Sequence, residues 1–231
     1  IKLDGNYPVG TGNVALGNTA LDSVEAGGTY NVALGDAAGT AITTGDGNVG
    51  VGADALLLNS SGGYNTALGT SSVRNNTTGN YNVGLGQGAL YSNTTASNNT
   101  AVGYQALFDN TTAERNTAVG RLAAANTTTG ADNTAMGSAA LTTNTTGANN
   151  IAIGASALRL NTTASNNTAV GFEAGYANTG DKNTFVGNEA GVANTSGRLN
   201  TMLGRRAGKS NTTASSNTFV GQASGETNTT G

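Results

Sequence analysis

The chain has 231 residues, with 36 glycines, one proline, no cysteine and no histidine, and its formal net charge is −3. This charge excludes a nucleic-acid-binding surface, and the missing cysteine and histidine exclude disulfides, the common nucleophile–base pairs and soft-metal sites. Since no run approaches the roughly 18 apolar residues of a membrane helix, we predict no membrane insertion.

Residues 1–12 come before the first copy of an internal repeat, and we interpret them as a lead-in or as the continuation of an upstream region. Over residues 13–231, a unit that opens with asparagine recurs thirteen times. Its period is 17 residues, apart from one interval of 18 after Asn13 and one of 16 after Asn167. We therefore predict one elongated repeat domain over 13–231. Because the pattern is cut at both ends, we expect a fragment of a longer chain.

Positions in the unit are counted from its opening asparagine, so that Asn99 is position 1 of the clearest copy. Position 5 is glycine in every copy, and position 4 is always aliphatic or methionine. Position 8 is alanine or serine, and positions 13 and 14 are nearly always threonine or serine. Fixed positions at a constant period indicate one structural unit per copy.

Each unit contains two short segments that favour β structure: Asn-Thr-Ala-Val-Gly at positions 1 to 5, and Thr-Thr at positions 13 and 14. Seventeen residues are too few for two helices, and glycine and asparagine at this density break helices. We therefore predict an all-β solenoid or β-roll, with coils stacked at about 4.8 Å into a rod of about 60 Å. The glycine at position 5 permits the bend, where a Cβ would clash or φ must be positive.

Stacked coils place identical positions above one another, so that each position forms a ladder between coils. We predict that position 4 fills the coil interior and that the asparagine, glycine and alanine ladders pair with the coils above and below. The clearest members of these ladders are Asn99, Val102, Gly103, Ala106, Asn116, Val119, Gly120, Asn133 and Gly137.

Position 3 lies on the opposite face of the strand from position 4, yet it is alanine, glycine, phenylalanine or methionine in every copy. A thin coil cannot bury both apolar faces, so we predict a homotrimer wound around a shared axis. Bulky residues at position 3 coincide with glycine at position 9, and we expect these positions to exchange volume. The pairs are Phe185 with Gly191, Met202 with Gly208, and Phe219 with Gly225.

Two segments carry a resemblance to a known family: residues 99–107 followed by Asn110-Thr-Thr, and residues 183–191. They resemble repeats of phage-type tail fibres and large bacterial surface proteins, and they are similar to the β-roll head repeats of YadA-like trimeric autotransporter adhesins. The resemblance implies a trimeric fibre on a cell surface or virion. It also implies attachment to a host-surface glycan or another receptor.

Acidic residues are scattered over variable positions, so we predict that the chain is not an enzyme and holds no cofactor or metal. Arg205 and Arg206 belong to a basic group near the C-terminal end, which either binds an acidic glycan or pairs with residues such as Glu189. Tyr104 and Phe172 are candidates for sugar stacking or for packing between chains.

Asn-x-Thr sequons recur at the coil period, and we favour turns and ladders over glycosylation as their explanation. The sequon asparagines include Asn93, Asn110, Asn144, Asn161 and Asn211. Adjacent threonines point to opposite faces, so only one threonine column is expected to be exposed. We predict an extracellular fibre shaft that spaces and presents a receptor-binding tip. The alternatives are an ice- or glycan-binding solenoid and a subunit of a filament that polymerises end to end.

Overall fold

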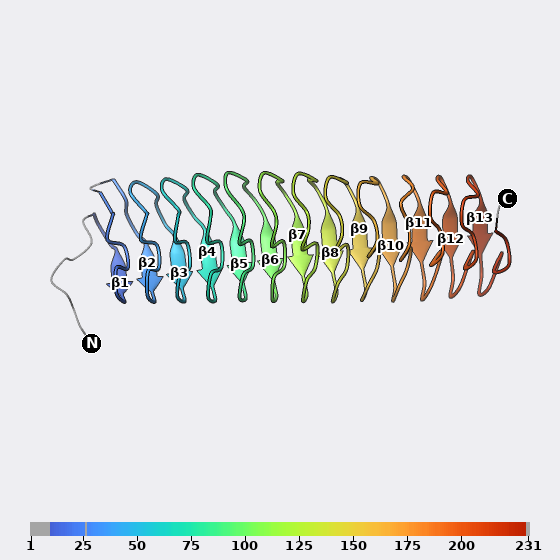
Figure 1. Ribbon diagram of the computed structural model, residues 1–231, viewed down its shortest axis with the longest axis horizontal. Helices are drawn as coiled ribbons and strands as arrows, with labels where there is room; N and C mark the ends of the chain where they lie inside the picture. The colour runs from blue at the N-terminus through green and yellow to red at the C-terminus, as the bar shows by residue number, and fades with distance from the viewer. Residues whose placement is uncertain (1–9, 26, 230–231) are drawn as a thin grey trace. The chain divides into compact units, whose positions relative to one another are not determined.

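The computed structural model describes residues 10–25 and 27–229. These residues form thirteen β-strands of three residues each and no helix. By its internal contacts the chain divides into two compact units, Ile1–Arg115 and Asn116–Gly231. Each unit is a parallel β-solenoid in which one coil of about 17 residues contributes one strand (Figure 1). The all-β solenoid is therefore confirmed, whereas the single domain over 13–231 stays a prediction.

In the first unit, neighbouring strands pair in parallel and in chain order, with equivalent repeat positions opposite each other, as in Val14 with Val32. The strands are β1 (Val14–Leu16), β2 (Val32–Leu34), β3 (Val49–Val51), β4 (Thr66–Leu68), β5 (Val83–Leu85) and β6 (Thr100–Val102).

In the second unit the same register continues, and the 16-residue coil does not shift it, because Thr168 still pairs with Thr184. The strands are β7 (Thr117–Val119), β8 (Thr134–Met136), β9 (Ile151–Ile153), β10 (Thr168–Val170), β11 (Thr184–Val186), β12 (Thr201–Leu203) and β13 (Thr218–Val220).

The middle residue of each strand, at position 3, faces the coil interior. Ala101 and Ala118 are fully buried, whereas the position-4 residues Val102 and Val119 point outward and are only half-buried. The prediction that position 4 fills the interior is therefore wrong. The interior is narrow, because a position-9 side chain such as Leu107 enters it from the facing wall and leaves room for only a small residue on the strand.

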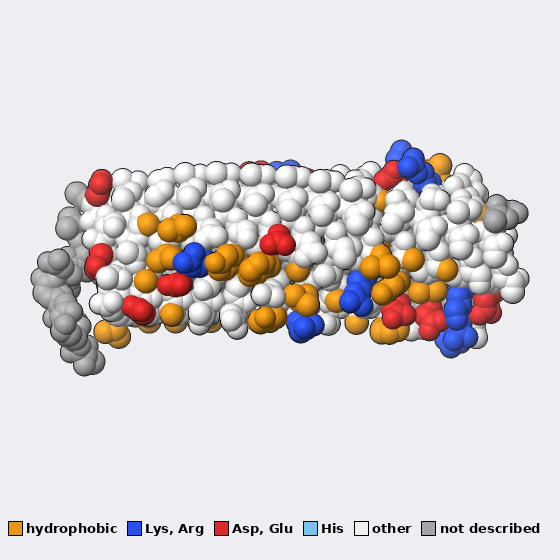
Figure 2. Space-filling view, in the orientation of Figure 1, with side chains coloured by type: hydrophobic (Ala, Val, Ile, Leu, Met, Phe, Trp, Pro, Cys, Tyr) orange, Lys and Arg blue, Asp and Glu red, His pale blue; other side chains and the backbone are white. Residues whose placement is uncertain are grey.

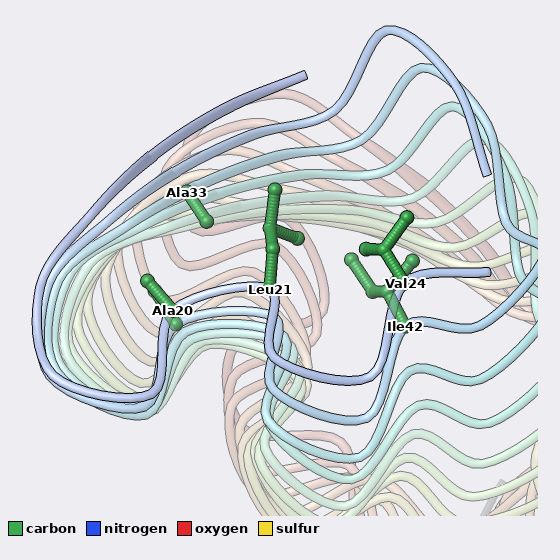
Figure 3. Close-up of a cluster of buried hydrophobic side chains, with 6 residues drawn as sticks. Ala20, Leu21, Val24, Ala33 and Ile42 are labelled. Carbon is green, nitrogen blue, oxygen red and sulfur yellow. The ribbon is translucent and has the colours of Figure 1, made fainter. Parts of the chain in front are cut away.

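The first coils show this packing directly. In Figure 3, Ala33 from β2 and Leu21 from the facing wall both point into the interior, and Val24 and Ile42 extend the same apolar cluster. Val24 and Ile42 stand at position 12, where most coils have asparagine. The first coils therefore have a more apolar interior than the later ones.

The predicted exchange of volume between positions 3 and 9 is confirmed. A Cβ built on Gly225 would lie 2.5 Å from Cδ1 of Phe219, and Cβ atoms on Gly191 and Gly208 would overlap the side chains of Phe185 and Met202. In the coil of Ala101, where position 3 is small, position 9 is the buried Leu107. The two positions therefore share one space in each coil.

The predicted second strand at positions 13 and 14 is wrong: among the described residues these positions form a bend. A second bend follows at position 17, where a residue such as Arg115 has a positive φ of 57°. The first bend still bonds to the next coil, since the Thr77 N–H donates to the Thr94 carbonyl at 2.7 Å.

At position 5, φ lies between 118° and 148° in every coil, which confirms the role predicted for glycine.

Candidate interaction surface

The asparagine at position 1 forms a buried ladder along the strand side of each unit. The N–H of Asn133 donates to Oδ1 of Asn116 at 2.8 Å, and Nδ2 of Asn116 donates to the Gly130 carbonyl at 3.0 Å. In the first unit, Nδ2 of Asn99 likewise donates to the Ala113 carbonyl at 2.8 Å. The Asn116 amide thus bonds both to the next coil and to position 15 of its own coil.

A second buried ladder consists of the asparagines at position 12. Nδ2 of Asn93 donates to Oδ1 of Asn76 at 2.8 Å and to the carbonyl of Ala96, at position 15, at 3.0 Å. Both ladders therefore converge on position 15. The sequon asparagines belong to this ladder, and their burial supports its structural explanation over glycosylation. The fully buried members are Asn93, Asn110, Asn144, Asn161 and Asn211.

The ladders are interrupted in the second unit. Thr127 takes position 12 of its coil, and its buried hydroxyl has no hydrogen-bond partner within the described chain. Around the 16-residue coil, Oδ1 of Asn161 and Nδ2 of Asn167 are also buried without a partner there. These interruptions occur where the sequence departs from its own repeat, so buried polar groups depend closely on coil length and residue type.

The outward strand face, defined as positions 2 and 4 of the strands within each unit, is apolar and accessible. Position 2 is valine, isoleucine or threonine, and position 4 is valine, leucine, isoleucine or methionine. Leu68 is 51% exposed in the first unit and Leu203 is 45% exposed in the second. Neither column contains a charged residue. The second apolar face expected from the sequence therefore exists, but it is the face of position 4.

The threonines at positions 13 and 14 have different environments. Thr94 is half-buried, and its hydroxyl donates to the Thr111 carbonyl of the next coil at 3.1 Å. Thr95, at position 14, is exposed. In the first unit only the position-14 column is exposed, as the sequence predicts, whereas in the second unit the position-13 residues Thr162, Thr179 and Thr195 are exposed too. Ice binding itself stays a prediction.

The basic group near the C-terminal end is neutralised in part by acidic neighbours. Nε of Arg206 lies 3.0 Å from a Glu189 carboxylate oxygen, and Nζ of Lys209 lies 3.3 Å from the same oxygen. The hydrogen bond from Lys209, with help from Arg206, holds the pKa of Glu189 below its ordinary value. Figure 2 shows acidic and basic side chains next to one another near this end of the second unit. Arg205 is exposed and has no ion pair among the described residues.

The predicted aromatic contacts, Tyr104 and Phe172, are exposed on coils of different units. Sequence reasoning missed two aromatic stacks: Tyr64 with Tyr81 at 5.3 Å between ring centroids, and Tyr91 with Phe108 at 4.9 Å. The sequence did contain a signal for these stacks, because the two aromatic residues of each pair are one period apart, at the same coil position. Within each stack one face of each ring covers the other, while Tyr64 and Tyr81 are still 58% and 59% exposed.

No group of three or more acidic, cysteine or histidine residues that could hold a metal ion occurs in the part of the chain that the structure describes. The same residues include no helix suited by length and apolar character to crossing a membrane. Comparison with known protein families, with curated protein sequences and with solved structures found no match to this chain.

Proposed function

We propose that this chain is part of the shaft of an extracellular fibre, and that the shaft spaces and presents an attachment tip. The observation that carries the proposal is the in-register stacking of near-identical coils in each unit, held by two buried asparagine ladders. Such a stack suits a mechanical role, because most coils repeat the same bonds to their neighbours.

The ladders supply the stiffness that a shaft needs. At Asn93, one buried side chain joins three coils, since it donates to Asn76 and accepts from Asn110, each at 2.8 Å. Bending or shearing the stack would leave these amides unpaired in the interior, which costs about 1–3 kcal/mol per group. Solenoids also gain stability coil by coil, so length can increase without a new core.

The surface suits exposure outside a cell. Only 10% of residues are charged, and polar uncharged side chains cover the bends. We also propose that the fibre is a homotrimer and that it adheres to a host-surface glycan or another receptor. We expect the receptor-binding group at the tip rather than along the shaft. On the shaft, Arg206, one of the candidate glycan contacts, already pairs with Glu189.

The experiment is a change in shaft length. Duplicating residues 82–149 adds four coils, and we expect the maximum dimension measured by small-angle X-ray scattering to increase by about 19 Å. The cross-sectional radius should stay the same. A matched control replaces these 68 added residues with a flexible Gly/Ser linker, which should not give the same increase. An unchanged maximum dimension after the coil duplication would contradict the shaft.

A further inference from the structure

We infer that the outward strand face packs against the same face of other copies of this chain, aligned in parallel and with equivalent coils side by side. The inference rests on the proposed shaft and specifies its partner and its contact surface. It starts from an uncovered parallel sheet: within each unit the strands pair only in parallel, and parallel sheets are almost always covered on both faces.

The composition of the face indicates a buried rather than a solvated surface. Position 4 is aliphatic or methionine in all thirteen coils, and position 2 is valine, isoleucine or threonine. Charged residues occur at other exposed positions, as at Lys182 and Arg198, but never in these two columns. At the last strand, Val220 is 62% exposed. A solvated strand face would alternate with polar and charged residues.

The size of the face is sufficient for a stable contact. At about 4.8 Å per strand and a width of about 10 Å, the six strands of the first unit present about 290 Å² and the seven of the second about 340 Å², which is about 600 Å² per chain. A pair of chains then buries about 1,200 Å² in total, which is the lower limit for specific interfaces, and a third chain raises the total to about 1,900 Å². The face therefore supports a permanent assembly best when several copies meet.

The best occupant of this face is an identical copy. Because the face has no charge, two copies meet without repulsion between like charges. A foreign partner would need to match a surface that repeats at about 4.8 Å, whereas an identical solenoid matches it at every coil. An interface of this kind also grows with shaft length, so each added coil adds its own contact.

The sequence along the face favours parallel alignment. In the first unit, position 2 is valine in four of the six strands; in the second it is threonine in six of the seven. Parallel copies place valine against valine and threonine against threonine, so that apolar pairs and hydroxyl pairs are both matched. An antiparallel pair would place the valine columns against the threonine columns.

The first test measures mass by size-exclusion chromatography with light scattering. The wild-type chain is expected to have a whole-number multiple of the chain mass, with three copies expected from the homotrimer. Changing Ile153→Lys and Leu203→Lys together should give the mass of one chain, with an unchanged circular dichroism spectrum. The control, Thr146→Lys with Thr163→Lys, adds the same charge at exposed position 14 and should keep the assembly. A monomeric wild-type chain, or a lysine variant with the wild-type mass, would overturn the inference.

The second test determines whether the copies are aligned in parallel. Since the chain has no cysteine, single variants Val51→Cys and Ile153→Cys can be treated separately with a short bismaleimide reagent. Parallel copies place each cysteine at the same height as its equivalent, so both variants should form covalent dimers on a denaturing gel. Thr146→Cys, on the exposed threonine column, should not. Failure of both variants, as an antiparallel pair would give, contradicts the parallel arrangement.

The outcomes distinguish an error in this proposed interface from an error in the proposed shaft function. A chain that stays monomeric but lengthens with added coils would overturn this interface and leave the shaft intact. A monomeric chain with thermal hysteresis that Ile153→Lys abolishes would assign the face to ice, and would likewise overturn the inference. An assembly that does not lengthen when coils are added would contradict the shaft alone.

Discussion

The ring of Phe185 fills the space that a side chain at Gly191 would occupy, and the same ring approaches Gly175 of the preceding coil. A Cβ on Gly175 would lie 2.5 Å from Cδ2 of Phe185. One phenylalanine on the strand therefore replaces side chains from the facing walls of two coils. Leu158 shows the alternative arrangement, with a buried leucine at position 9 facing Ala152.

We predict that Gly191→Leu destabilises the chain by at least 1–3 kcal/mol, because it overfills this space. Phe185→Ala should cost about 3–5 kcal/mol through the cavity that it leaves. Combined, the two changes should cost less than their sum, since Leu158 already adopts φ 49° at position 9 and the backbone accepts leucine there. Chemical denaturation of the four proteins gives the coupling. Additive costs would show that positions 3 and 9 do not share space.

A matched pair of glycines tests the close approach of coils at position 5. A Cβ on Gly120 would lie 2.6 Å from the Gly137 carbonyl oxygen, whereas Gly221 has nothing within 4 Å. Their φ angles are 134° and 118°, so alanine is strained at both sites. We predict that Gly120→Ala lowers the free energy of unfolding by at least about 2 kcal/mol more than Gly221→Ala. Equal losses in denaturation would indicate that strain, and not the clash, fixes this glycine.

The period, the stacking and the ladders could be predicted because each depends on residues that recur at one spacing, such as Asn116 and Asn133. The inward face could not be chosen, because both columns of the strand are apolar and a shift of one residue exchanges the faces. The structure places Ala118 inside the coil and leaves Val119 half-buried on the outer face. Residue class alone does not reveal how wide the interior is.

The non-glycine residues with positive φ could not be predicted from the sequence either. Leu107 has φ 50° and Gln105 has φ 52°, although neither residue type favours this region. The packed stack imposes these angles, and the sequence indicates them only through occasional glycines at the same positions, such as Gly88 at position 7 and Gly191 at position 9. For the candidate surface, the sequence indicated a second apolar face and an oligomer. It offered the pairing of the basic group with Glu189 as one of two alternatives, and the structure shows that pair between Arg206 and Glu189 in neighbouring coils.

Restoring the missing residue of the 16-residue coil should stabilise the second unit. There, the Gly180 carbonyl accepts from Asn178 and Asn183, while Nδ2 of Asn167 has no partner within the described chain. Inserting threonine between Thr179 and Gly180 restores the usual spacing. We predict a gain of about 1–3 kcal/mol in the free energy of unfolding, the cost of one unsatisfied buried group.

The control for this insertion uses a regular coil. The same threonine inserted between Thr163 and Ala164 lengthens a coil of 17 residues and should destabilise, because the Ala164 carbonyl accepts from Asn150 at 2.9 Å and from Asn161 at 3.0 Å. Both proteins are compared with the wild-type chain in urea. If both insertions destabilise equally, the unpaired amide of Asn167 is not what limits the short coil.

Glu189 should make stability depend on pH. Its pKa is lowered from the ordinary value of 4.5 by the hydrogen bond from Lys209 and by Arg206. Because the folded pKa is the lower one, the stabilisation is complete above 4.5 and is lost as the pH falls through the folded value. We predict that Glu189→Gln lowers the melting temperature at pH 7, and that the difference from wild type shrinks below pH 4.5.

Glu173 provides the matched control for this carboxylate. It stands at the same coil position one coil earlier, and it has no ion pair among the described residues. Glu173→Gln should therefore leave the melting temperature close to that of wild type at both pH values. Since exposed ion pairs weaken with salt, the effect of Glu189→Gln at pH 7 should also decrease in 1 M NaCl, where the screening length is about 3 Å. A Glu189→Gln effect that is independent of both pH and salt would mean that the side chain acts through packing rather than through its charge.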